Sequence, residues 1–66
     1  MFKHTVPTVA LQVEDQIKIG GEVYYVSYRP SINGGRYRIE LTSVSNAGLE
    51  LAIYAPPSAL FKITRP

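Results

Sequence analysis

The 66-residue chain contains no cysteine, so neither a disulfide framework nor a thiolate metal site can supplement its hydrophobic core. A chain of this length forms one domain and buries only about 60% of the surface that its unfolded form exposes. Stability must therefore come from side-chain packing, from closure of a sheet or from self-association. The absence of cysteine also fits a reducing setting, and we expect a cytoplasmic protein.

The sequence also lacks the features of a membrane protein, of a helical protein and of an enzyme. No apolar run is long enough for a signal peptide or a membrane span, and every window of a dozen residues with helical periodicity contains Gly or Pro. The single histidine, His4, lies in the range 1–5, for which we expect disorder. Glu14 and Asp15 are adjacent carboxylates, and Asp15 is expected to begin a turn. The sequence therefore predicts no catalysis, no cofactor, no metal and no membrane partner.

The chain does contain short apolar stretches that are separated by Gly, Asn and Pro clusters, and this pattern predicts strands. An edge strand is expected over 6–13, because Val9, Leu11 and Val13 alternate with polar or small residues and Pro7 lies near its start. Further short strands are expected over the ranges 16–19, 22–29, 36–43, 49–55 and 61–64. Gly20 and Gly21 predict a tight hairpin turn.

The alternation within these strands predicts which side chains face the core. The inward residues are expected to be Tyr24, Val26, Tyr37, Ile39, Leu41, Leu49, Leu51, Ile53, Ala55, Phe61 and Ile63. One turn of 3₁₀-helix is expected over 58–60, with Leu60 closing the end of a barrel. The predicted fold class is thus all-β, a single domain over residues 1–66 that forms a five-stranded barrel.

This order of elements, with a 3₁₀ turn just before the final strand, resembles that of SH3-like barrels. Within that class, the ten residues Ile17-x-Ile19-Gly20-Gly21-Glu22-x-Tyr24-x-Val26 resemble the first hairpin of translation-factor and KOW-type barrels. The resemblance implies a barrel that binds nucleic acid, ribosomes or peptides, and it implies no catalysis.

The outward residues provide the candidate site. If a hairpin closes over 29–36, Arg29 lies opposite Arg36, and Tyr25 lies opposite Glu40. If the next hairpin closes around Asn46, Arg38 lies beside Tyr54, and Thr42 faces Glu50. One end of the sheet would then present five candidate binding residues, Arg29, Arg36, Arg38, Tyr25 and Tyr54.

Arginines that follow a phosphate backbone and tyrosines that stack on bases are typical of surfaces for single-stranded nucleic acid or RNA. The formal net charge of +2 and the pI of about 9.2 favour a polyanionic partner. Two other interpretations stay open at this point. Arg38 and Tyr54 can form an ordinary cation–π pair, and the apolar strip of Val23, Tyr25, Ala52 and Tyr54 suits a protein partner.

Self-association is a further expectation, because subunit contacts add burial that so small a core lacks. Whether the strand expected over 6–13 pairs within the barrel or with a neighbouring chain stays open. Size and economy alone indicate a small accessory protein, for example of a phage, that acts on a host protein.

Overall fold

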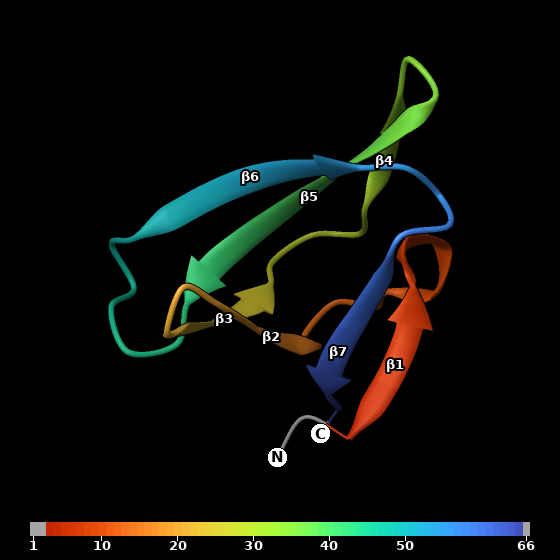
Figure 1. The fold of residues 1–66 in the computed structure, drawn as a ribbon. Helices are drawn as coiled ribbons and strands as arrows, with labels where there is room; N and C mark the ends of the chain where they lie inside the picture. The colour runs from red at the N-terminus through yellow and green to blue at the C-terminus, as the bar shows by residue number, and fades with distance from the viewer. Residues whose placement is uncertain (1–2, 66) are drawn as a thin grey trace.

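Residues 3–65 are described by the computed structural model, and they form a curled antiparallel sheet with the shape of a half-barrel (Figure 1). The seven strands are β1 (His4–Pro7), β2 (Gln16–Ile19), β3 (Glu22–Val26), β4 (Ser31–Asn33), β5 (Arg36–Ser43), β6 (Glu50–Ala55) and β7 (Leu60–Thr64). The sheet order is β1-β7-β2-β3-β5-β4, and β6 also pairs with β5. The all-β prediction is confirmed, whereas the prediction of five strands in a closed barrel is wrong.

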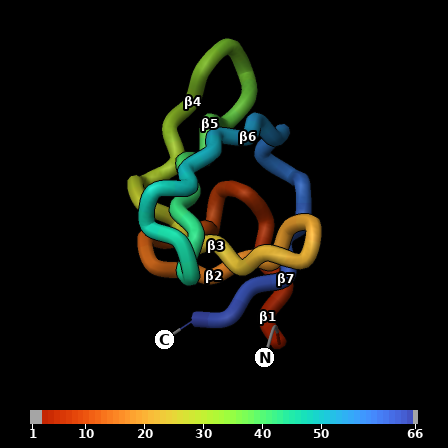
Figure 2. Tube along the Cα trace, turned by 90° about the vertical axis from the view of Figure 1, so that its left-hand side faces the viewer, coloured from red at the N-terminus to blue at the C-terminus, as the bar shows by residue number. Residues whose placement is uncertain are grey.

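The sheet curls around one hydrophobic core. Figure 2 shows β5 and β6 on one side of the curl and β2, β3 and β7 on the other. The buried apolar side chains come from both sides: Leu11, Ile17, Tyr24, Val26, Ile39, Leu41, Ala55 and Ile63. Leu51, Ile53 and Phe61 pack against this cluster while partly buried, as the alternation predicts, but Leu49 is exposed because it precedes β6.

The β2–β3 hairpin forms where the sequence predicts it. Ile19 pairs with Glu22 across Gly20 and Gly21, whose φ angles are +58° and +85°. Positive φ at both central residues is the geometry of a type I′ turn, and glycine adopts it without a steric cost.

The edge strand predicted over 6–13 is wrong beyond Pro7. The backbone N–H of Thr8 donates to the Ala59 carbonyl at 2.9 Å, and its hydroxyl donates to the Pro56 carbonyl at 2.8 Å. These bonds draw the chain into the 3₁₀-helix η1 (Thr8–Ala10), so Val9 is 56% exposed while Leu11 is buried. The strand β1 begins at His4, inside the range for which the sequence suggests disorder, and residues 1–2 lie outside the described part of the chain.

The last connection also differs from the prediction. In place of a 3₁₀-helix over 58–60, a tight turn forms, closed by a bond of 3.1 Å from the Ala59 N–H to the Pro56 carbonyl. Leu60 is the first residue of β7 and is 68% exposed, so it closes no barrel end.

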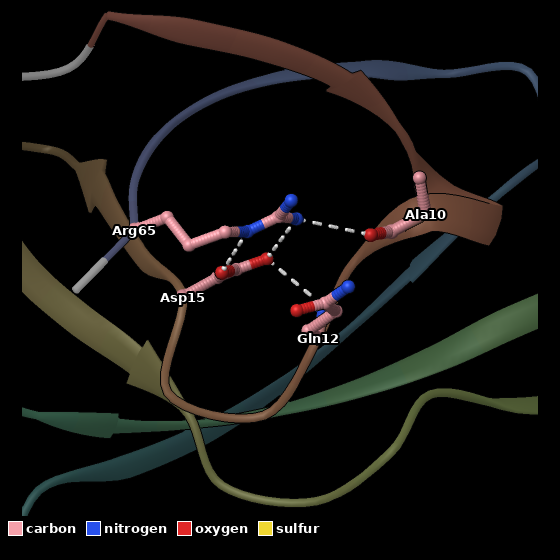
Figure 3. Close-up of polar contacts among 4 residues, drawn as sticks. All are labelled: Ala10, Gln12, Asp15 and Arg65. Carbon is pink, nitrogen blue, oxygen red and sulfur yellow. Dashed lines mark hydrogen bonds and ion pairs between the residues drawn. The ribbon is translucent and has the colours of Figure 1, made fainter.

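An ion pair between Asp15 and Arg65 joins the segment after η1 to the end of β7 (Figure 3). The Asp15 side chain is 1% exposed and accepts hydrogen bonds from Arg65 Nε at 2.8 Å and Arg65 Nη2 at 2.9 Å. It also accepts from the Gln12 N–H at 2.9 Å, while Arg65 Nη2 donates to the Ala10 carbonyl at 3.2 Å. The turn role expected for Asp15 is therefore combined with a long-range one, because Arg65 fixes the segment after η1 against the end of β7.

These contacts decide the ionisation of Asp15. Burial acts to raise the pKa of its carboxyl, but the hydrogen bonds from Arg65 and Gln12 and the charge of Arg65 outweigh burial, so the pKa lies below the ordinary value of 3.8. Because the folded-state pKa is depressed, the stabilisation is present above the unfolded-state pKa and is lost as pH falls below about 4 toward the folded-state value.

We predict that Asp15→Asn lowers the free energy of unfolding at neutral pH by about 1–3 kcal/mol, because it removes charge-assisted hydrogen bonds from a buried site. Urea denaturation measures the change, and Glu14→Gln is the matched control since it removes one negative charge from an exposed neighbour. Below pH 4 the difference between Asp15→Asn and the wild type should shrink. An equal loss of stability in both variants would contradict the stabilising role of the Asp15 hydrogen bonds.

Candidate functional site

The outer face of β5 and β6 brings Arg38 and Tyr54 together, as the sequence predicts. The two residues are directly opposite in the register, and Thr42 is opposite Glu50. Arg38 Nη1 donates to the Tyr54 hydroxyl at 2.9 Å, and the guanidinium carbon lies 5.9 Å from the centre of the ring. The expected cation–π pair is therefore present, and the same guanidinium group also donates a hydrogen bond to the Tyr54 hydroxyl.

The charge of Arg38 is shared with a carboxylate on the same strand. Glu40 lies two residues along β5, on the same face, and its carboxylate oxygen is 3.5 Å from Arg38 Nε. The hydrogen bond to Tyr54 and the charge of Glu40 raise the pKa of Arg38 above its usual value. Arg38 therefore has two partners within the molecule, and a phosphate would have to compete with them.

The register of β3 with β5 differs by two residues from the predicted one. Tyr25 lies opposite Thr42, and the Ser27 N–H donates to the Glu40 carbonyl at 2.9 Å. The strand β3 ends at Val26, and after Pro30 the chain pairs with β5 again as β4, in a hairpin that places Asn33 opposite Arg36. Pro30 lies in the four-residue gap between β3 and β4 and has no N–H to donate to a ladder.

Because of this break, Arg29 does not lie opposite Arg36, and that prediction is wrong. Arg36 is exposed beside the Gly34-Gly35 turn of the β4–β5 hairpin. Arg29 instead lines a hollow on another part of the molecule. Of the five predicted residues, Arg38 and Tyr54 are paired and Tyr25 lines the same hollow as Arg38, whereas Arg29 and Arg36 lie apart from these three.

A first hollow lies over the outer face of β3, β5 and β6 and has a volume of about 580 Å³. Tyr25, Tyr28 and Arg38 line it. Three carboxylates also line it, against this single arginine, and they belong to Glu14, Glu40 and Glu50. A surface with this charge balance does not favour a polyanion.

The second hollow has a volume of about 890 Å³ and lies between the η1 segment and β4. Its walls are mostly apolar, and Val9, Val13 and Ile32 are among the exposed large hydrophobic side chains that line it. Arg29 and Arg65 supply positive charge. Among the described residues that line this hollow, none carries a carboxylate.

Sequence reasoning missed this second hollow. The sequence places Val9 and Val13 on one face of an expected edge strand, and Ile32 lies in a segment expected to be a loop. The one signal that could have found it is Ile32 itself, because a large apolar residue between Pro30 and Gly34 has no core position to occupy in a surface turn.

A hydroxyl cluster at the end of β5 is structural in character. The Ser43 and Ser45 hydroxyls both donate to the Glu22 carboxylate, and these bonds lower its pKa below the usual value. The Asn46 N–H in turn donates to Ser43 Oγ at 3.1 Å, which fixes the turn between β5 and β6. A carboxylate stabilised in its charged form is a poor general base. Within residues 3–65, no group of three or more His, Asp or Glu side chains could hold a metal ion.

Comparison with family models, with curated proteins and with solved structures found no match for this chain. In the part of the chain that the structure describes, no helix is long and apolar enough to cross a membrane.

We predict that Thr8→Val lowers the free energy of unfolding by about 1 kcal/mol, because it keeps the shape of a fully buried side chain but removes the hydroxyl that bonds to Pro56. Thr5→Val, at an exposed position of β1, is the control and should change stability little. Urea denaturation of both variants gives the comparison. Equal stabilities would mean that the Thr8 bond does not hold η1 in place.

Proposed function

We propose that the protein is a small, non-enzymatic binding module that takes an apolar, acidic segment of another protein in the second hollow. The observation that supports this proposal is the gathering of exposed Val9, Val13 and Ile32 beside Arg29. A contiguous exposed apolar surface next to polar groups marks an interaction site on a small protein.

The charge of the hollow determines the chemistry of the partner. Arg65 is engaged by Asp15, so its charge is largely balanced. Arg29 is exposed at the hollow and no ion pair to a described residue balances it. A partner segment with apolar side chains and a carboxylate near Arg29 would therefore be complementary to this surface.

The proposal includes the finer interpretation of the fold as an SH3-like barrel related to translation-factor and KOW-type domains. The β2–β3 hairpin with its Gly20-Gly21 turn supports this interpretation. The resemblance implies a binding domain, and peptides are one of its ligand classes.

The nucleic-acid hypothesis is the second candidate, with Arg29, Arg36, Arg38, Tyr25 and Tyr54 as the binding residues. It is favoured by the pairing of Arg38 with Tyr54 and by the net charge of +2. The three glutamates of the first hollow and the separation of Arg29 from Arg38 weigh against it. The protein-binding proposal is therefore the one that the geometry supports better.

Selection of binders from a display library of random linear peptides tests the proposal. We predict that the selected peptides are enriched in large apolar residues and in Asp and Glu, and that Ile32→Ser weakens their binding about tenfold. Leu60→Ser is the matched control, because Leu60 is 68% exposed and Ile32 is 69% exposed, but Leu60 lines neither hollow. Equal effects of the two variants would contradict the proposed site.

The charge of the partner is tested with the same selected peptides. Arg29→Glu should weaken their binding, and Arg36→Glu should leave it unchanged, because Arg29 lines the second hollow and Arg36 does not. In parallel, fluorescence anisotropy with labelled single-stranded and duplex oligonucleotides at low and moderate salt tests the second candidate. Salt-dependent oligonucleotide binding that is lost in the Arg36→Glu/Arg38→Glu variant would favour the nucleic-acid hypothesis over the protein-binding one.

A further inference from the structure

The outer edge of β6 carries backbone groups that point away from the molecule. Ser43 N–H donates to the Leu49 carbonyl at 2.9 Å, and this bond fixes which residue pairs of the β5–β6 ladder exchange hydrogen bonds. By alternation, Leu51, Ile53 and Ala55 bond to β5. The N–H and C=O groups of Glu50, Ala52 and Tyr54 therefore face the opposite edge, where no strand of residues 3–65 pairs with them.

This edge differs from the other open edges of the sheet. The edge strand β1 has four residues and ends at Pro7, and β4 has three. The strand β6 has six residues, Glu50–Ala55, with no proline, no lysine and no break in its ladder. Proteins commonly protect long edge strands with proline, lysine or a break in the ladder. An edge strand that lacks all three can readily pair with another strand. Figure 1 shows β6 along the margin of the molecule.

We propose that β6 is the interface of a homodimer, in which the β6 strands of two copies pair antiparallel about a two-fold axis at Ala52. In this register Ala52 faces Ala52 of the second copy, and Glu50 faces Tyr54 of the second copy. All three outward residues then exchange backbone hydrogen bonds, and the two half-barrel sheets become one continuous sheet.

Charge complementarity favours this register. The carboxylate of Glu50 lies beside Tyr54 of the second copy, whose neighbour across the β5–β6 ladder is the cationic Arg38. A register in which two Glu50 side chains face each other would bring like charges together, which destabilises a strand pair.

The residues of β6 that face the core also favour pairing with a second copy of the chain. Leu51 and Ile53 are only partly buried in the single chain. In the proposed register, Leu51 of one copy lies opposite Ile53 of the other, so pairing would remove more of both side chains from water. Pairing with a second copy thus gives hydrogen-bond partners to the open backbone groups of β6. It also brings Glu50 near a positive charge and removes Leu51 and Ile53 further from water.

Disulfide trapping tests the interface, because the chain has no cysteine of its own. Opposed residues of an antiparallel pair have Cα atoms within the range that a disulfide spans, so Ala52→Cys should form a covalent dimer readily under mild oxidation. Ala47→Cys, at an exposed position of the neighbouring loop, is the control for random collision. No preference of Ala52→Cys over Ala47→Cys would overturn the proposal.

Sedimentation over a range of concentrations provides the second test. The wild type should shift from monomer to dimer as the concentration rises, and the Ala52→Ser variant should do the same. Ala52→Asp should raise the dissociation constant of the dimer about fivefold or more, because it places two carboxylates opposite each other. A monomer at every concentration, or species larger than a dimer, would overturn the proposal. Ile32→Ser, which acts at the second hollow, should dimerise normally, so failure here is distinct from failure of peptide binding.

Discussion

The backbone pairing of β5 with three other strands holds the sheet together. The eight residues of β5 pair with β3 and β4 on one side and with β6 on the other. Since residues on a strand alternate in direction, the same alternation that buries Ile39 and Leu41 turns Arg38 and Glu40 to the outer face. The ladder to β6 then fixes which backbone groups of β6 remain open.

A second set of contacts, distant in sequence, creates the apolar hollow. Thr8 bonds to the carbonyls of Pro56 and Ala59, and Asp15 bonds to Arg65. These bonds hold η1 and the following residues against the β6–β7 connection and the end of β7, with the Val9 side chain outward. The hollow and the β6 edge therefore have separate structural origins, and a change at one need not affect the other.

Local patterns in the sequence are sufficient to predict the central hairpins. The alternation of Tyr37, Ile39 and Leu41 and the turn at Asn46 predict the β5–β6 register, including the Arg38 and Tyr54 pair, and Gly20-Gly21 predicts the β2–β3 turn. Long-range bonds are not visible in the same way. The alternation of Val9, Leu11 and Val13 resembles a strand, but the partners of Thr8 lie about fifty residues away, so the sequence alone could not reveal η1 or the hollow beside it.

Amide hydrogen exchange, followed residue by residue by NMR, tests the pairing of β6 with β5 and the open edge of β6. In dilute solution, the amides of Leu51, Ile53 and Ala55 should exchange slowly, because they bond to β5, and those of Glu50, Ala52 and Tyr54 should exchange fast. Raising the protein concentration should slow the second set. Uniform protection along β6 in dilute solution, or fast exchange at Leu51 and Ile53, would contradict the register of β5 with β6 and the open edge that follows from it.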